Sequence, residues 1–230
     1  YIKTPAPDRE PLPRDTRPME ATPGPLPRGE NWWLQVSFGG RRVIVRVDGG
    51  RAHITDADGA DIEAPSLREL GPSLGATAVL LDGELVGGDL WIGDLLHLDG
   101  CDTAGLPFRE RRALLEDLPL AGPHWRLAPV FPAGGPEVVA AVRQQGLGGV
   151  VAKDADAPDV ELRRAAAQRV LPNQVIGENE VNVCARRPRR QFRARRISES
   201  QRDDAISDRL SLLHDQVGLV LPADGLSRCH

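Results

Sequence analysis

Residues 32–42 read WWLQVSFGGRR, and this stretch decides how the rest of the chain is interpreted. Apolar and polar side chains alternate from Leu34 to Phe38, which predicts a short strand. Gly39 and Gly40 then permit a tight turn, and a pair of arginines follows it. Such a turn can bring backbone amides close to a phosphate, with cations beside it. It can equally be a plain hairpin between two strands, so the stretch alone leaves both interpretations open.

Strand signals continue through a central region, residues 31–173, which we expect to form one α+β domain. Alternating segments on both sides of Asp48-Gly49-Gly50 predict a hairpin. A second turn is expected at Asp82-Gly83, between strands at 77–81 and 84–92. Helical spacing and helix-end signals predict helices at 109–118 and 136–145, and a short buried strand is expected at 149–152.

The two ends differ from this centre. Residues 1–30 are proline-rich and polar, which predicts an extended arm. Residues 174–230 form an arginine-rich tail in which Ile206, Leu210, Leu213 and Val217 recur at helical spacing, so one amphipathic helix is expected there. No internal repeat is present.

The chain has 230 residues and a formal net charge of −4, so as a whole it is not a basic nucleic-acid binder. It contains no run of about 18 apolar residues, which excludes a transmembrane helix on sequence grounds. The three cysteines lie far apart and are odd in number, which favours a reducing, cytoplasmic location. Among 29 basic residues only Lys3 and Lys153 are lysine, so chemistry that needs a lysine amine has two candidates. We expect a monomer.

Four phrases occur in an order that resembles the adenylation domain of ATP-dependent DNA ligases, most closely the bacterial repair type. They are QVSFGGRR at 35–42, LDGEL at 81–85, GDLLHLDG at 93–100 and GLGGVVAK at 146–153. Each phrase alone is a weak signal, whereas all four in order are specific. The resemblance covers residues 17 to about 170. It implies an ATP-grasp-like nucleotidyltransferase fold with antiparallel sheets and flanking helices.

The resemblance also implies a reaction. In the family a lysine amine attacks the α-phosphate of ATP, AMP remains on the lysine as a phosphoramidate, and AMP then passes to a DNA 5′-phosphate. ATP and Mg²⁺ are the implied cofactors and DNA the implied partner. Such a site needs a lysine amine activated by its surroundings and carboxylates for the metal.

Several of the family's chemical residues are replaced in this chain. Ser37 stands at the position of the nucleophilic lysine, and Gly39 at that of the aspartate in the same phrase. Gly93 replaces the phenylalanine that stacks on adenine, and Gly148 replaces a metal-associated glutamate. The losses fall on side chains that handle phosphate, metal and adenine, whereas turn glycines and apolar strands remain. The pattern predicts a pseudoenzyme, a domain that keeps its shape without the reaction.

Three residues remain as candidate nucleotide contacts: Arg42, Glu84 and Lys153. In the family the lysine at 153 contacts the nucleotide phosphates, and the glutamate at 84 holds ribose or metal. Each also has a structural interpretation. Lys153 can be a lysine at a strand end, Glu84 a hairpin glutamate, and Arg42 part of a solvated arginine pair.

The candidate DNA contacts lie in residues 186–196, RRPRRQFRARR, which hold seven arginines and no acid. This composition suits contact with a phosphate backbone, with Phe192 as a stacking partner. It is also typical of solubilising tails. The five arginines assigned to DNA are Arg186, Arg187, Arg189, Arg190 and Arg193.

Two functional hypotheses follow from different classes. The first is a degenerate ligase homologue that acts in DNA repair or recombination by binding DNA, or a repair protein, without sealing. The second is a working ligase or nucleotidyltransferase with a relocated nucleophile, for which Lys153 is the placed candidate. A covalent adenylate on lysine distinguishes them. A third interpretation, a fragment with an incomplete fold, predicts that cooperative melting is absent.

Overall fold

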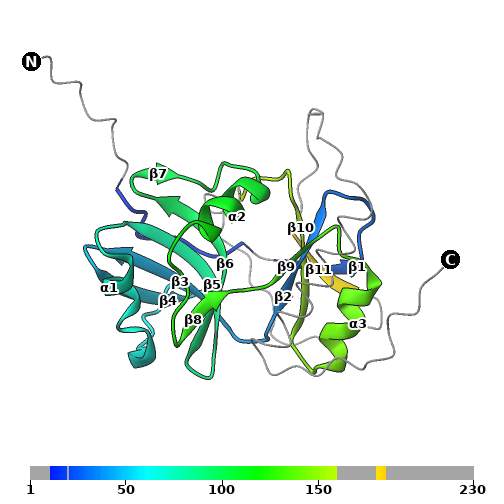
Figure 1. The fold of residues 1–230 in the computed structure, drawn as a ribbon, viewed down its shortest axis with the longest axis horizontal. Coiled ribbons are helices and arrows are strands. Elements are labelled where there is room, and N and C mark those ends of the chain that lie inside the picture. The colour runs from blue at the N-terminus through cyan, green and yellow to red at the C-terminus, as the bar shows by residue number, and fades with distance from the viewer. Residues whose placement is uncertain (1–10, 20, 160–179, 185–230) are drawn as a thin grey trace, which may run out of the picture.

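The computed structural model describes residues 11–19, 21–159 and 180–184, which contain two sheets and their flanking helices (Figure 1). The strands are β1 (Thr22–Pro25), β2 (Trp32–Ser37), β3 (Arg41–Asp48), β4 (Arg51–Asp56), β5 (Val79–Val86), β6 (Asp89–Leu98), β7 (Cys101–Asp102), β8 (Trp125–Leu127), β9 (Val130–Pro132), β10 (Gly149–Asp154) and β11 (Glu180–Cys184). The helices are a short 3₁₀ helix η1 (Pro65–Leu67), α1 (Leu70–Leu74), α2 (Phe108–Glu116) and α3 (Pro136–Gln144).

One sheet has the order β4-β3-β5-β6-β7, with β8 added parallel to β6. The expected hairpin around Asp48-Gly49-Gly50 is confirmed as β3 and β4. The turn expected at Asp82-Gly83 is wrong, because β5 runs through both residues and the chain reverses at Gly87-Gly88 instead. Both of those glycines have positive φ, which a two-residue hairpin turn requires.

Asp82 and Gly83 stay inside the ladder for separate reasons. Gly83 is needed because a Cβ there would lie 2.6 Å from the backbone oxygen of Trp91 on β6. Asp82 is 2% exposed and is paired with an arginine on β3. A dipeptide that usually marks a turn is therefore used here for close backbone approach and a buried ion pair.

The other sheet has the order β1-β11-β10-β2-β9, in which β10 and β11 are parallel and the other pairs are antiparallel. The expected strand at 149–152 is confirmed as β10, and the expected helix at 136–145 as α3. Pro136 stands in the first turn of α3, where a missing N–H costs nothing, and Gly146 with positive φ follows its end. The α+β class with antiparallel sheets is confirmed.

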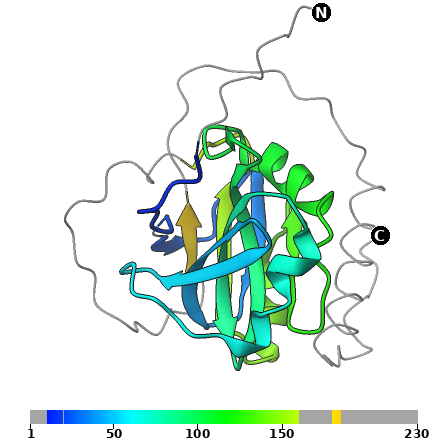
Figure 2. The ribbon, with the colours of Figure 1, turned by 90° about the vertical axis from the view of Figure 1, so that its left-hand side faces the viewer.

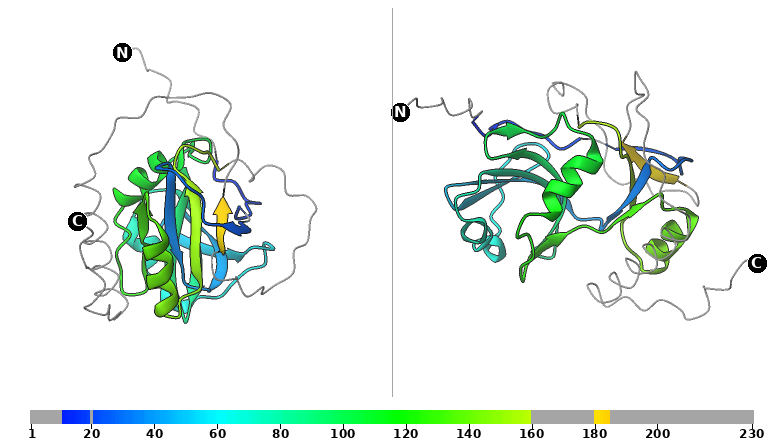
Figure 3. Two further views of the ribbon diagram at one scale, coloured as in Figure 1. Left: turned by 90° about the vertical axis from the view of Figure 1, so that its right-hand side faces the viewer. Right: turned by 45° about the horizontal axis from the view of Figure 1, so that its top comes forward.

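Each sheet has its own apolar core. Val43, Val45 and Leu81 belong to the core of the six-stranded sheet, which η1 and α1 also enter. Leu34, Val36 and Val150 form the second core with Val138 and Val142 of α3. In Figure 1 the six-stranded sheet with α1 occupies the left of the molecule and the five-stranded sheet with α3 the right. The side views show α3 along the five-stranded sheet (Figure 3) and α1 beside β4 (Figure 2).

The segments outside the central region take part in the fold. Leu12 packs with Ile44, Leu80 and Leu96 in a third apolar cluster. Strand β1 lies within the predicted arm, and β11 lies within the predicted tail and pairs with β10. The division at residues 30 and 173 stays a prediction, and the amphipathic helix expected near residues 206–217 lies outside the described residues. Within the described part of the chain, no helix has the length and apolarity that a membrane crossing needs.

Candidate functional site

The turn between β2 and β3 lies next to Glu84, which lines a pocket between the two sheets. Its backbone N–H groups at Phe38 and Gly40 both donate to Oε2 of Glu84, at 2.9 and 3.3 Å. Gly39 adopts φ +71 and donates to the Ser37 hydroxyl at 3.4 Å. The turn is not a hairpin, because β2 and β3 belong to different sheets. Its amides attract an anion, and the anion they hold is a carboxylate of the protein itself.

Arg42 lines this pocket and is engaged by Asp82. Its Nε donates to Oδ1 at 2.6 Å, and its Nη2 donates to Oδ2, so the pair is bidentate. Asp82 is buried, and a guanidinium fixed in this way gives geometric specificity as well as energy. Arg42 therefore joins β3 to β5 at the place where the sequence predicted a phosphate contact.

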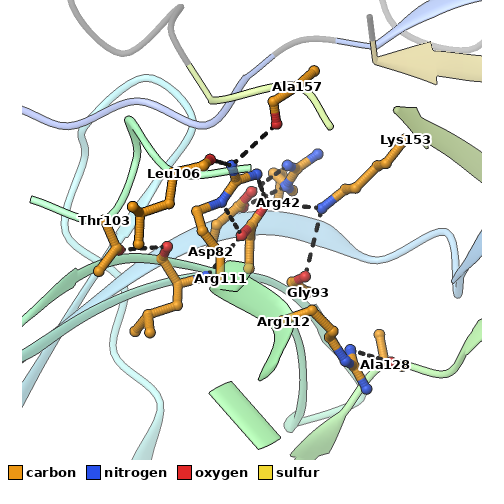
Figure 4. A network of polar contacts seen from close by, with 12 residues as sticks. Arg42, Asp82, Gly93, Thr103, Leu106, Arg111, Arg112, Ala128, Lys153 and Ala157 are labelled. Carbon is orange, nitrogen blue, oxygen red and sulfur yellow. Dashed lines mark hydrogen bonds and ion pairs between the residues drawn. The ribbon is translucent and has the colours of Figure 1, made fainter. Parts of the chain in front are cut away.

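A second buried network lies deeper and centres on Asp94 of β6 (Figure 4). Arg111 of α2 donates to both its oxygens, at 2.8 and 2.9 Å, and Lys153 of β10 lies 3.1 Å from Oδ2. Burial raises the pKa of Asp94, but the charges and hydrogen bonds of Lys153 and Arg111 outweigh it and hold that pKa far below the usual range. The carboxylate therefore stays ionised and fixes both cations.

Lys153 is 4% exposed, although it contributes to the lining of the pocket. Its ammonium also donates to the Gly93 carbonyl oxygen at 3.5 Å and lies 4.4 Å from the centre of the Phe108 ring. The ion pair, the hydrogen bond and the ring hold the ammonium group against β6 and α2. The geometry is that of a structural lysine that links β10 to β6.

Asp159 adds a third carboxyl to this region. It is 2% exposed, and its Oδ1 has no hydrogen-bond partner within the described residues. Burial, followed by repulsion from Asp94 and Asp82, raises its pKa to about 7, although Arg111 and Lys153 act in the opposite direction. Ionisation of a third carboxylate next to Asp94 and Asp82 is therefore unfavourable.

Two glycines near the pocket, Gly39 in the turn and Gly148 before β10, approach each other closely. A Cβ at Gly148 would lie 2.2 Å from the backbone nitrogen of Gly39, and one at Gly39 would lie 3.2 Å from the Gly148 Cα. These are the positions at which the family resemblance places a glutamate and an aspartate. Backbone now packs against backbone there, so neither position has room for an acid in this conformation.

One aromatic ring, that of Trp91, lines the pocket. Phe38 stacks on it with ring centroids 3.8 Å apart, and the Arg126 guanidinium lies 5.1 Å from its centroid. Gln35 and Gly93 line the same pocket, together with Arg42, Glu84 and Lys153. The cavity that remains measures about 10 Å³, which is about the space of one water molecule.

These residues do not fit ATP in this arrangement. The position of the nucleophile is a serine, and no histidine or carboxylate contacts its hydroxyl among the described residues. Position 93 carries no ring, Glu84 is held by the turn, and the cavity cannot hold a base. Among the residues that the structure describes, no three acidic, histidine or cysteine side chains gather as metal ligands would.

The structure brings Arg42, Glu84 and Lys153 to one pocket, where each is engaged by the protein, and their role as nucleotide contacts stays a prediction. The sequence interpretation missed Asp82, Arg111 and Gln35 as partners within the site. Asp82 belongs to the phrase LDGEL at 81–85, but the sequence did not indicate that this aspartate would be buried. Arg111 gave no signal, because it is one of several arginines on an amphipathic helix. The five arginines assigned to DNA lie outside the described residues.

Comparison with known proteins agrees with the order of the phrases. No protein-family model matches the chain. Over 174 residues it is 32% identical to the multifunctional non-homologous end joining DNA repair protein LigD of Mycobacterium tuberculosis, a match that covers 65% of this chain and 23% of the relative. It is 30% identical over 180 residues to LigD of Mycolicibacterium smegmatis, with 67% and 23% covered. The chain thus spans about a quarter of the length of these relatives.

Solved structures give the same result. A mycobacterial DNA ligase D complexed with ATP and MES has a TM-score of 0.56 and 29% identity, over 63% of this chain and 56% of that one. The ligase domain of Mycobacterium tuberculosis LigD has a TM-score of 0.56 and 28% identity, over 63% and 55%. The fold is that of a ligase adenylation domain.

Proposed function

We propose that this chain, whose folded core is homologous to the ATP-dependent DNA ligase domain of LigD proteins, keeps that domain's fold but does not transfer AMP. The observation that carries the proposal is the ion pair that holds Lys153 against Asp94. Lys153 is the one lysine among the described residues, and Ser37 stands at the position of the nucleophile without a base. A serine without a base is a weak nucleophile.

The alternative, an active ligase with Lys153 as relocated nucleophile, requires this amine to leave Asp94 and approach an α-phosphate. The ion pair holds the amine against β6, and the side chain is almost fully buried. We therefore favour a pseudoenzyme over a relocated active site.

A non-catalytic role in DNA repair is the second part of the proposal. Residues 11–19 and 21–159 carry 14 basic and 21 acidic side chains, a net charge of −7 with histidine neutral. Such a core repels a phosphate backbone. DNA binding is therefore assigned to the arginine run at 186–196, and the acidic core is left for a protein partner in repair.

The test is a nicked duplex with a 5′-phosphate, incubated with the full chain, ATP and Mg²⁺. We expect a complex on a native gel and no sealed strand on a denaturing gel. The mycobacterial LigD ligase domain serves as the positive control for sealing. A sealed strand would overturn the loss of catalysis, and the absence of any complex would overturn the assignment of DNA as a partner.

A further inference from the structure

The side chain of Gln35 occupies the space beside Gly93, at the inner end of the pocket. Gln35 lies on β2, between β10 and β9, whereas Gly93 belongs to β6 of the other sheet. A Cβ built at Gly93 would meet all three terminal groups of the amide, with Nε2 at 2.4 Å, Cδ at 3.2 Å and Oε1 at 3.4 Å. The carboxamide therefore fills the volume into which any side chain at position 93 would project.

This amide is held without full hydrogen bonding. Gln35 is 9% exposed, and its Oε1 has no partner within the described residues. A buried polar oxygen without a partner destabilises a fold. The position therefore gains little from the chemistry of the amide, and what the side chain supplies is bulk in a cavity of about 10 Å³.

We propose that Gln35 is a specificity-determining residue that plugs the inner end of this pocket against Gly93 and so excludes a nucleobase. The inference rests on the proposed function, because it concerns the same pocket and explains by shape, independently of the missing lysine, why a nucleotide does not enter. Specificity of this kind comes from a steric clash in place of an attractive contact.

Two variants separate shape from hydrogen bonding. Gln35→Ala removes the plug, whereas Gln35→Met keeps a side chain of similar length and removes the polar atoms. The probe is AMP, titrated calorimetrically into the full chain. We expect Gln35→Ala to bind AMP at least about tenfold more tightly than the wild type, and Gln35→Met to behave like the wild type.

Two other outcomes of this titration would contradict the steric role of Gln35. Affinities within about threefold for all three proteins, including no measurable binding by any of them, would show that removing the amide opens no base site. An equal gain in Gln35→Met would show that polarity and not bulk excludes the base.

A second measurement does not depend on nucleotide binding. Gly93→Ala places a methyl group against the amide, so we expect it to lower the melting temperature in the wild type and to lower it less in the Gln35→Ala background. Equal losses in both backgrounds would show that the amide does not fill this space.

The two proposals fail separately. Reversible AMP binding by Gln35→Ala without a covalent adduct supports both. Failure of the plug leaves the absence of catalysis untouched, because that claim is tested by covalent adenylate and sealed DNA.

Discussion

The ammonium group of Lys153 lies 3.1 Å from Oδ2 of Asp94, in a site where both side chains are almost fully buried. The two residues come from different sheets, β10 and β6, so this ion pair connects the two halves of the fold across the pocket. A lysine that the sequence offers as a candidate catalyst is thus a structural link.

Replacing Lys153 is expected to destabilise the fold. Lys153→Met keeps the aliphatic stem over Phe108 but removes the charge, which leaves Asp94 with one cation. Breaking a buried pair by removing one partner costs about 3 kcal/mol. Urea unfolding of Lys153→Met, Asp94→Asn and the double variant measures this cost. A coupling energy near zero between the two sites would contradict the structural role.

The contact between Gly39 and Gly148 predicts a steric penalty. Gly148→Ala places a methyl group 2.2 Å from the Gly39 nitrogen, so we expect a loss of about 2 kcal/mol. Gly105→Ala is the matched control, because a Cβ there meets nothing within 4 Å and its φ is not positive. The control is expected to change stability by no more than about 1 kcal/mol. Equal effects of the two substitutions would show that Gly39 and Gly148 are not in close contact.

The pKa of Asp159, raised to about 7 by burial and by the repulsion of Asp94 and Asp82, predicts a pH dependence. A carboxyl with a higher pKa in the folded state binds more protons when folded. Its contribution to the free energy of unfolding is therefore complete below the pKa of the unfolded state, near 3.8, and is lost as the pH rises through 7.

Asp159→Asn should remove this loss. Between pH 5 and pH 8 the wild type is expected to lose about 2 kcal/mol that the variant retains. Unfolding by urea at both pH values gives the comparison, and parallel pH profiles for the two proteins would contradict the prediction. The pKa of Asp94 is lowered, so this residue has the opposite effect: its contribution to the free energy of unfolding is lost only as the pH falls into the acid range.

The arginine run predicts salt-dependent binding to DNA. Replacing Arg186, Arg187, Arg189, Arg190 and Arg193 with alanine should weaken binding to a nicked duplex. If each contacts one phosphate, the slope of log K against log salt should become shallower by about 4. Arg51→Ala with Arg68→Ala is the control, because both lie exposed on the acidic core. A larger effect of this control pair would move the DNA site to the folded core.

How far the sequence predicts this protein depends on the kind of feature. The hairpin at Gly49-Gly50 and helix α3 follow from local signals, and the structure confirms them. Asp82-Gly83 carries a turn signal that the ladder overrides, because its burial depends on Arg42 and on the close approach of β6. Local chemistry cannot reveal such a tertiary contact.

The candidate site shows the same division. The phrases that carry the resemblance located Arg42, Glu84 and Lys153 in one pocket. They could not reveal that the Phe38 and Gly40 amides hold Glu84, or that the Gln35 amide lies against Gly93. The first contact depends on the pairing of β3 with β5 and the second on the meeting of the two sheets, so spacing and composition do not reveal them.

The most direct test of the central claim is the intact mass of the purified, folded chain after incubation with ATP and Mg²⁺, repeated with Mn²⁺. The mycobacterial LigD ligase domain, treated in parallel, shows that the reagents are competent. We expect the mass of this chain to stay unchanged, because Ser37 lacks a base and Lys153 is held by Asp94. A gain of one adenylyl group, located on Lys153 by peptide mapping, would contradict the account and identify an active nucleotidyltransferase.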